Sequence, residues 1–316
     1  MSGIVLLTEI DHLEILSVMD NYADASASSS PVVERFSSYE KGIVRSDTLF
    51  AEHGFSLLLR AKRRNEESAV MLDAGWSGKG TIHNLNLLNV NLSEIQAAVL
   101  SHGHIDHFGG LTRLAAAIGK SFSLICHPGV FQDSRIRLTP DGEKIKYPVL
   151  KKEELASAGA QVIENKLPIL FGNGFFAATG EIPMVTEFEQ GTSNLYLDDG
   201  INLVKDDVSE EQSIAANVRG KGLVVISGCA HRGIINTIEQ ARSMTGIEKV
   251  YAVIGGLHLG GPLSGQIIDP TIRRLKEISP ALLAPMHCTG WEALHILAGE
   301  FKDSFILNSV GNLFKL

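Results

Sequence analysis

The stretch Ser101-His102-Gly103-His104-Ile105-Asp106-His107-Phe108-Gly109-Gly110-Leu111 decides how the rest of the chain is interpreted. It places three histidines and one aspartate within six residues, directly after the apolar run 97–100 and before a Gly-Gly pair that opens a helix-compatible segment. The pattern predicts a strand, a tight ligand-bearing turn and a helix start. Imidazoles and a carboxylate together suit zinc, iron or manganese, and a turn at a strand's carboxyl end leaves one side open to substrate. The alternative is an ordinary polar loop, although four ligand-type residues at this spacing rarely coincide without a metal.

Length and composition indicate a large globular protein. The chain has 316 residues, of which 44% are hydrophobic and 20% charged, so it can bury a sizeable core. No composition break divides it, and we expect one domain over residues 1–316, with a lid or excursion in the hydrophilic stretch 133–152.

The same composition bounds the location and the partners of the protein. The N-terminus lacks a basic region, and Leu6-Leu7 is too short an apolar run for export or for a bilayer, which predicts a cytoplasmic protein without membrane contact. Three scattered cysteines predict reduced thiols rather than a disulfide framework. The formal net charge of −8 argues against a nucleic-acid partner but still allows a local basic pocket for a small phosphate.

Strands alternate with helices along the chain, and ligand-type residues recur where strands end. The apolar strand 69–72 ends at Asp73, whose carboxylate can accept the free N–H of a metal-bound imidazole and so fix its tautomer. Three later apolar strands lead to further candidates, namely 222–227 to Cys229 and His231, 250–254 to His258, and 282–286 to His287. A lone histidine after a strand is usually just packed, but its recurrence beside glycines favours one shared site.

The remaining elements follow from periodicity. A strand is expected over 13–21, ending in Asp20-Asn21, and others over 55–59, 122–126 and 175–178. Helical spacing predicts helices over 81–92, 111–118, from 234 onward, and over 267–278 and 291–299.

Several polar residues outside the histidine-rich turn allow a functional or a structural interpretation. His53 is either a substrate contact or a histidine satisfied at a strand start. Glu181, in a Gly-Glu-Ile-Pro turn, is a ligand, a base or a solvated carboxylate, and His127 is expected to be structural because Pro128 follows it. The usual explanation of an acidic cluster is a solvated loop, which we expect for Asp206, Asp207, Glu210 and Glu211.

The run from His102 to His107, with Asp73 upstream and His287 downstream, resembles the metallo-β-lactamase superfamily. The resemblance covers nearly the whole chain from about residue 13. It implies an α/β fold, the four-layer αββα sandwich, with a dinuclear site along one edge. By that resemblance His102 and His104 bind one metal ion, while Asp106 and His107 bind the other, which His287 completes.

Further motifs resemble one branch of this superfamily. They are Glu52-His53-Gly54, Gly180-Glu181-Ile182-Pro183, the run from Ser227 to Gly233, Gly255-Gly256-Leu257-His258-Leu259, and Pro285-Met286-His287-Cys288. The branch is that of the metal-dependent hydrolases of β-lactamase superfamily II, which includes archaeal 7,8-dihydropterin-6-methyl-4-(β-D-ribofuranosyl)aminobenzene 5′-phosphate synthases. That name implies transfer of a pterin-methyl group from a phosphorylated donor to an aromatic acceptor.

Two departures from the superfamily pattern concern the metal ligands. No Gly-His-Thr segment lies between Gly180 and Gly228, and His231 is the first candidate to replace the missing third histidine of the first metal. Cys229 stands where the bridging aspartate is expected, either as a thiolate ligand or as a small buried residue beside the ligands. We therefore expect the site to hold one or two divalent ions, zinc first, with iron or manganese as alternatives.

These observations predict a metal-dependent hydrolase or group-transfer enzyme acting on a small phosphorylated, pterin-like substrate. The predicted catalytic residues are Asp106, Arg232 and His258, and the predicted substrate contacts are His53, Glu181, Arg232 and His258. Arg232, at an expected helix start, would pair with a substrate phosphate, unless its side chain is simply solvated. The alternatives are an iron-dependent oxidoreductase of the sulfur dioxygenase type and a non-catalytic metal-containing ligand sensor. RNA processing would need a basic surface, which the sequence lacks.

Overall fold

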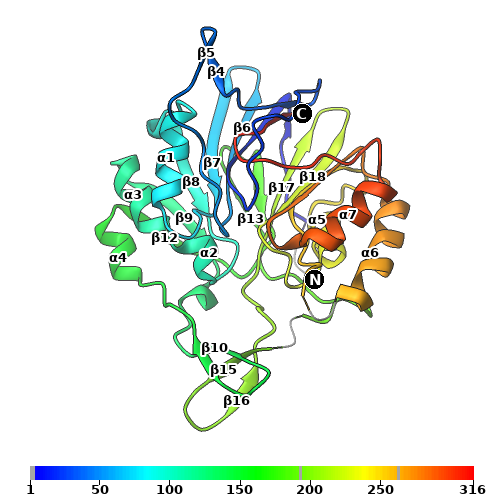
Figure 1. The fold of residues 1–316 in the computed structure, drawn as a ribbon. Coiled ribbons are helices and arrows are strands. Elements are labelled where there is room, and N and C mark those ends of the chain that lie inside the picture. The colour runs from blue at the N-terminus through cyan, green and yellow to red at the C-terminus, as the bar shows by residue number, and fades with distance from the viewer. Residues whose placement is uncertain (1–3, 192–193, 262–263) are drawn as a thin grey trace.

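Two mixed sheets pack face to face, and helices cover the outer side of each sheet (Figure 1). The computed structural model describes residues 4–191, 194–261 and 264–316. Near the N-terminus Val5 N donates to Met244 O in a helix, and at the C-terminus Leu316 pairs with Leu13 in a strand.

The first sheet has eight strands and contains the strands on either side of the histidine-rich turn. Its order is β12 (Ala160–Glu164), β9 (Phe122–Cys126), β8 (Ile95–Val99), β7 (Glu66–Leu72), β6 (Ser56–Arg63), β2 (His12–Met19), β21 (Leu313–Lys315) and β3 (Val33–Glu34). The strands β7, β8, β9 and β12 are parallel neighbours. Side chains along β7 and β8 are buried on both faces, which explains their continuous apolar runs.

The second sheet has seven strands. Its order is β13 (Ile169–Phe171), β14 (Phe176–Ala178), β17 (Ile214–Val218), β18 (Gly222–Ser227), β19 (Val250–Gly256) and β20 (Leu282–Met286), with β1 (Glu9–Ile10) beside β17. The strands β18, β19 and β20 are parallel, so their carboxyl ends reach the same edge of the sheet.

Helices form the outer layers. They are α1 (Lys79–Leu87), α2 (Ile105–Phe108), α3 (Leu111–Ile118), α4 (Lys152–Ser157), α5 (Ile234–Thr245), α6 (Ser264–Ile278) and α7 (Trp291–Glu300), with short 3₁₀ turns at Leu92–Glu94, Pro128–Phe131 and His287–Thr289. The sequence of α3 explains its place in an outer layer, because its apolar side chains share one buried face, formed by Leu111, Leu114, Ala115 and Ile118. Gly119 ends the helix with a φ of 67°. One apolar cluster fills the space between the two sheets, and one lies under the helices on each outer side.

A small sheet projects from one end of the sandwich (Figure 1). Its order is β11 (Lys144–Lys146), β10 (Arg135–Leu138), β15 (Leu195–Asp198) and β16 (Leu203–Lys205), all antiparallel. We call it the projecting sheet. The stretch 133–152, expected as a lid or excursion, supplies its β10 and β11. A separate two-stranded ribbon joins β4 (Tyr39–Glu40) and β5 (Ile43–Val44).

The observed elements match most of those predicted from periodicity. The predicted helix 111–118 and the predicted strands 122–126 and 282–286 have the observed bounds. The αββα fold class is confirmed. Among the helices of the described residues, none combines the length and the apolar character needed to cross a bilayer.

Candidate metal centre

The ligand-type residues gather at the edge where strands of both sheets end. His102, His104, Asp106 and His107 follow β8, and Asp73 follows the neighbouring β7. His231 follows β18 and His287 follows β20 on the second sheet. All six predicted metal ligands therefore lie in one cluster, with His102 and His107 fully buried.

Three imidazoles form a first donor set, namely His102, His104 and His231. Nε2 of His102 lies 2.9 Å from Nδ1 of His104 and 3.2 Å from Nε2 of His231. Four ligand atoms arranged tetrahedrally around zinc at about 2.05 Å stand roughly 3.3 Å apart, so this spacing suits a metal ion. His231 therefore lies where the missing third histidine was expected.

A second donor set consists of Asp106, His107 and His287. Nε2 of His107 lies 3.1 Å from Nε2 of His287. Oδ2 of Asp106 lies 3.8 Å from Nε2 of His107 and 3.3 Å from Nε2 of His287. Cys229 connects the two sets, because its Sγ lies within 4.8 Å of donor nitrogens of both His102 and His107.

Asp73 fixes the orientation of the second set. Its Oδ2 lies 2.7 Å from Nδ1 of His107, which turns Nε2 of that ring toward the cluster. The backbone N–H and the hydroxyl of Ser101 also donate to Asp73, each at 2.7 Å. This carboxylate is fully buried, and three hydrogen bonds hold it in place.

His287 is held from the first sheet by residues that the sequence analysis did not single out. Its backbone N–H donates to Oδ1 of Asp20 at 2.9 Å, and Asn21 Nδ2 donates to its carbonyl at 2.9 Å. Both residues follow β2, so the pattern of polar residues at strand ends that pointed to Asp73 could have identified them as well.

Burial and the neighbouring charges keep the first donor set neutral. Burial, with the nearby imidazoles as a further cause, lowers the pKa of His102 and of His231 well below the usual value, and burial with the Arg135 charge does so for His104. Neutral imidazoles with nitrogens 2.9–3.2 Å apart direct lone pairs at one another, an arrangement that a cation between them stabilises. The buried Nε2 of His104 and Nδ1 of His231, on the far sides of these rings, have no hydrogen-bond partner among the described residues.

The second donor set combines one carboxylate with two imidazoles. Burial opposes protonation of His107, but the carboxylates of Asp73 and Asp106 raise its pKa to about 9. Burial likewise disfavours ionisation of Asp106, yet His107 and His287 lower its pKa below the usual range. Asp106, held ionised in this mostly buried site, gives the set one anionic donor beside the imidazole nitrogens of His107 and His287, and a divalent cation can take the place of the proton on His107.

Left-handed backbone is concentrated around the cluster. Asp73, Ala230, His258 and His287 all have positive φ, between 45° and 61°. Such a conformation costs on the order of 1 kcal/mol per non-glycine residue and persists where the surroundings enforce it. Its concentration here supports a functional site.

His258 and His53 lie beside the donor sets. The His258 ring contacts that of His231 at an interplanar angle of 48° with centroids 4.1 Å apart, and its Nδ1 lies 3.5 Å from Cys229 Sγ. Nε2 of His53 lies 3.7 Å from Oδ2 of Asp106, and its side chain is 63% exposed. Both histidines line the cavity described below.

A buried ion cluster connects the histidine-rich turn to the projecting sheet. Arg135, on β10, donates to Oδ2 of Asp206 at 2.5 Å, to Oε1 of Glu210 at 2.6 Å and to the carbonyl of Gly103 at 3.1 Å. Glu211 accepts the backbone N–H groups of His231 and Arg232, each at 2.7 Å. The prediction of a solvated acidic loop was therefore wrong for Asp206, Glu210 and Glu211, which are buried. Their carboxylates accept hydrogen bonds from an arginine that is distant in the chain or from backbone N–H groups of the turn after β18.

Two predicted substrate contacts lie elsewhere. Arg232 donates from Nη1 to Oδ2 of Asp207 at 2.6 Å and from Nε to the carbonyl of Ile182 at 2.9 Å, and it does not line the cavity. Glu181 accepts from Nε2 of His127 at 2.9 Å, also outside the cavity lining. His127 in turn accepts from Gly129 N, so its interpretation as a structural residue fits these contacts.

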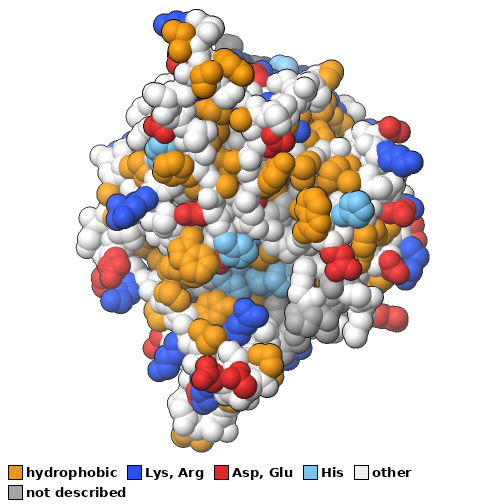
Figure 2. Space-filling view, viewed as in Figure 1, with side chains coloured by type: hydrophobic (Ala, Val, Ile, Leu, Met, Phe, Trp, Pro, Cys, Tyr) orange, Lys and Arg blue, Asp and Glu red, His pale blue; other side chains and the backbone are white. Residues whose placement is uncertain are grey.

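A cavity of about 960 Å³ opens over the cluster. Figure 2 shows histidine side chains at the floor of a hollow, with hydrophobic side chains on one side and a Lys or Arg side chain toward the projecting sheet. Its lining includes Trp76, Tyr147, Phe188, Arg137, His104 and His258. Apolar walls with a few polar groups are typical of sites for small organic molecules.

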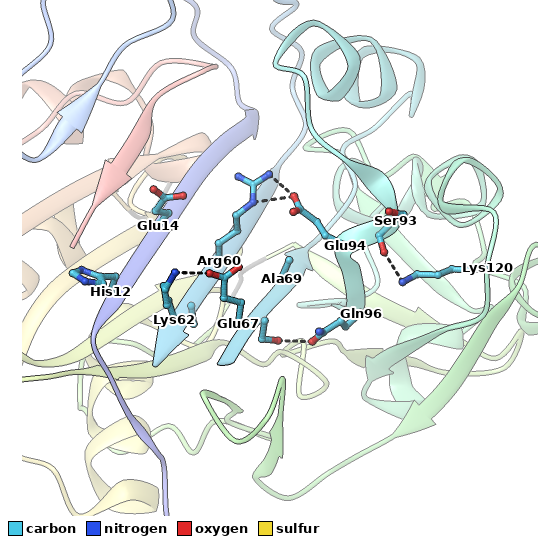
Figure 3. Close-up of a pocket in the computed structure, with 12 residues that line it drawn as sticks. His12, Glu14, Arg60, Lys62, Glu67, Ala69, Ser93, Glu94, Gln96 and Lys120 are labelled. Atoms are coloured by element: carbon cyan, nitrogen blue, oxygen red, sulfur yellow. Dashed lines mark hydrogen bonds and ion pairs between the residues drawn. The ribbon is translucent and has the colours of Figure 1, made fainter. Parts of the chain in front are cut away.

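A second depression, of about 530 Å³, lies over the strands β2, β6 and β7 and the turn before β8, and contains none of the donor residues (Figure 3). Four of its charged groups form ion pairs with each other, Arg60 with Glu94 at 2.6 Å and Lys62 with Glu67 at 2.7 Å. Because the two donor sets lie at the larger cavity, that cavity is the candidate active site.

Comparison with known proteins agrees with this geometry. The sequence model of the metallo-beta-lactamase superfamily matches residues 50–121. A protein of Methanocaldococcus jannaschii named 7,8-dihydropterin-6-methyl-4-(beta-D-ribofuranosyl)-aminobenzene-5′-phosphate synthase is 30% identical over 272 residues, which cover 84% of this chain and 90% of the relative. This chain belongs to the metallo-β-lactamase superfamily. A second protein of that organism, described as uncharacterized, is 31% identical over 266 residues, with 84% and 93% of the two chains covered.

Solved structures share the superfamily fold. Tm1679, described as a metal-dependent hydrolase of the β-lactamase superfamily, superposes with a TM-score of 0.72 at 21% identity, covering 96% of this chain and 98% of that one. Zn²⁺-bound PqqB from Methylobacterium extorquens has a TM-score of 0.51 at 13% identity, with 96% and 99% of the chains covered. Membership in this superfamily implies divalent metal binding, which the clustered histidines, Asp106 and Cys229 fit.

Proposed function

We propose that this chain is a metal-dependent enzyme that transfers or hydrolyses a group on a small phosphorylated, pterin-like substrate. The observation that carries the proposal is the pair of three-donor sets at the floor of a cavity of about 960 Å³. The relative's name supports the substrate class, because it describes a compound that contains a dihydropterin, an aminobenzene, a ribose and a phosphate.

The residues present fit two divalent ions, with zinc as the first choice. His102, His104 and His231 would hold one ion, and Asp106, His107 and His287 the other. Nitrogen-rich donor sets with one carboxylate and a nearby thiol suit zinc better than magnesium or calcium. When bound, such ions polarise a phosphoryl or carbonyl oxygen and lower the pKa of a bound water.

The protein's own groups would position the substrate and move protons. His258 lines the cavity, and the contact of its Nδ1 with Cys229 leaves Nε2 as the atom to exchange a proton with the substrate. Asp106, held ionised by His107 and His287, would orient the attacking group. His53, on the exposed side of Asp106, would contact the substrate.

The lining of the cavity suits a flat aromatic ligand. Trp76 and Tyr147 come from different segments of the first half of the chain, and Phe188 comes from the second. Aromatic side chains offer stacking surfaces for a pterin or an aminobenzene ring, and each such contact contributes on the order of 1 kcal/mol.

The test replaces one proposed ligand and compares it with a histidine outside the site. We expect His104→Ala to lose one bound metal ion and at least about 10²-fold in turnover, because it removes a metal ligand. His295→Ala is the matched control, since His295 is exposed on α7 and absent from the cavity lining. Metal content is measured by elemental analysis. Turnover is followed by mass spectrometry with a phosphorylated dihydropterin-methyl donor, with and without an aminobenzene acceptor.

The two incubations separate transfer from hydrolysis. Coupling to the acceptor indicates transfer, and release of a hydroxymethyl dihydropterin without the acceptor indicates hydrolysis. Full turnover by His104→Ala, or a metal-loaded wild type that returns the donor unchanged in both incubations, contradicts the proposal. Oxygen consumption by iron-loaded protein would support the oxidoreductase alternative instead.

A further inference from the structure

One face of the projecting sheet is turned toward the metal centre. Arg135 pairs with Leu197 across β10 and β15, and its guanidinium contacts the Gly103 carbonyl in the histidine-rich turn. Tyr147 N donates to the carbonyl of Arg135, so these two residues lie side by side. The Tyr147 ring centroid is 5.0 Å from that of the proposed ligand His104. The row formed by Arg135 and Tyr147 therefore borders the metal centre.

Arg137 lies one row further out on the same face. It is paired with Ile145 on β11 and with Leu195 on β15, and all three residues line the cavity. Alternate residues of a strand share a face and lie about 6.5–7 Å apart along it. Arg137 thus lies one row beyond the row of Arg135 and Tyr147, about 6.5–7 Å farther along the strand from the metal centre.

Arg135 and Arg137 differ in their partners. Arg135 is buried between Asp206 and Glu210, whereas Arg137 is exposed to the cavity. Within residues 4–191, 194–261 and 264–316, the guanidinium of Arg137 takes part in no hydrogen bond or ion pair. Nearby Lys144, by contrast, is paired with Asp198 at 2.6 Å. An unpaired guanidinium facing an apolar-walled cavity is suited to binding an anionic group of a ligand.

Other charged groups around the cavity make its outer part cationic. Lys146 and Lys205 also line it, although the register places them in the row of Ile136 and Tyr196, on the other face of the projecting sheet. Glu187 lines the cavity as well, while the carboxylate of Glu189 is already occupied by the backbone N–H groups of Ile235 and Asn236. The positive charge of Arg137 also acts on Tyr147, where burial raises the pKa of the phenol and Arg137 opposes that rise.

We propose that Arg137 anchors a terminal phosphate of the substrate, one that does not react, while the Tyr147 ring lies against the part of the substrate between that phosphate and the metal centre. This proposal rests on the function proposed above and specifies its substrate as a compound that carries an aromatic unit and a phosphomonoester at opposite ends. The planar guanidinium matches phosphate oxygens in a bidentate manner. Arg137 thus has the phosphate-binding role that the sequence suggested for Arg232, because the guanidinium of Arg232 is already held by Asp207 and the Ile182 carbonyl.

The test measures the contribution of the phosphate to binding. The ligands are 7,8-dihydropterin-6-methyl-4-(β-D-ribofuranosyl)aminobenzene 5′-phosphate and its dephosphorylated form, titrated calorimetrically into the metal-loaded protein. We expect the wild type to prefer the phosphorylated compound by about 10- to 100-fold, the size of a charge-assisted contact. Arg137→Gln loses this preference and binds the dephosphorylated compound as the wild type does. Arg137→Lys recovers part of the preference, because a lysine keeps the charge without the planar fork.

Lys144→Gln is the matched control. It also removes one positive charge from the projecting sheet, but Lys144 does not line the cavity. If Lys144→Gln reduces the preference as much as Arg137→Gln does, the effect is long-range electrostatics and the anchor is refuted. With the donor of the turnover assay and an aminobenzene acceptor that carries a ribose 5′-phosphate, Arg137→Gln should raise KM for that acceptor and leave kcat unchanged, as expected for loss of uniform binding.

The outcomes separate this proposal from the proposed function. Equal binding of both compounds by the wild type, with turnover intact, refutes the anchor and leaves the function standing. If the wild type binds neither compound, the pterin-like substrate class fails. Titration with inorganic phosphate then tests the role of Arg137 by itself. Phosphate binding that is present in the wild type and lost in Arg137→Gln supports it, and no phosphate binding by the wild type overturns it.

Discussion

Replacing Arg135 tests how the projecting sheet and the metal centre depend on each other. Arg135→Met keeps most of the side-chain volume but removes the groups that contact Asp206, Glu210 and the Gly103 carbonyl at 2.5, 2.6 and 3.1 Å. Two carboxylates that are 5% and 3% exposed then lose their cation. Removing one partner of a buried ion pair costs about 3–5 kcal/mol, chiefly because the remaining charge is stranded. The lost hydrogen bond to the Gly103 carbonyl adds about 1 kcal/mol.

Urea denaturation of the metal-free protein measures this cost. We expect Arg135→Met to lower the free energy of unfolding by about 4 kcal/mol, and the triple variant Arg135→Met, Asp206→Asn, Glu210→Gln to recover at least half of it, because it removes all three charges of this buried cluster. Because Gly103 lies between two proposed ligands, Arg135→Met should also weaken metal binding by about 10- to 100-fold. A loss below about 1 kcal/mol, or a triple variant no more stable than the single one, would refute the argument that stranded charge dominates.

Two further predictions concern buried carboxylates. Asp73→Asn should weaken metal binding about 10- to 100-fold in a chelator competition, because the carboxylate that orients His107 at 2.7 Å becomes a neutral amide; unchanged affinity would contradict this role. Burial raises the pKa of Glu189 from 4.5 to about 7, even though backbone N–H groups oppose the rise. Its stabilising contribution is therefore complete below about pH 4.5 and is lost as the pH rises through 7. The unfolding free energy of the wild type minus that of Glu189→Gln should fall by up to about 3 kcal/mol between pH 4.5 and 7.5. A difference that does not change with pH would refute the shift.

Local patterns were sufficient to predict the alternation of strands and helices and the residues that gather in the cluster, whereas the sandwich was expected from the resemblance to the superfamily. The strands β8, β18, β19 and β20 are apolar runs followed by glycine-containing turns, and such signals depend on few distant residues. Because carboxyl ends of parallel strands meet at one edge, the residues that follow them had to approach each other. The position of His231 beside His102 illustrates this, since 129 residues separate them in the chain.

Features that depend on distant partners could not be predicted in the same way. The strands β11 and β16 are exposed along their whole length, so they lack the apolar alternation that marks a strand. Glu210 is acidic and lies in a polar run, which suggests a solvated loop unless its arginine, 75 residues away, is known. Arg232 shows the reverse case: its position at a helix start suggested an anion site, but Asp207 already occupies its guanidinium.

The composition of the two donor sets also has a consequence for folding. Each set takes residues from both sheets, and His107 and His287 are 180 positions apart in the chain. An ion bound to such a set acts as a cross-link between the two halves of the sandwich, and by closing a long loop it restricts the unfolded chain strongly. Since a complete set exists only once both sheets have docked, metal binding can stabilise the assembled sandwich but cannot initiate folding of either half.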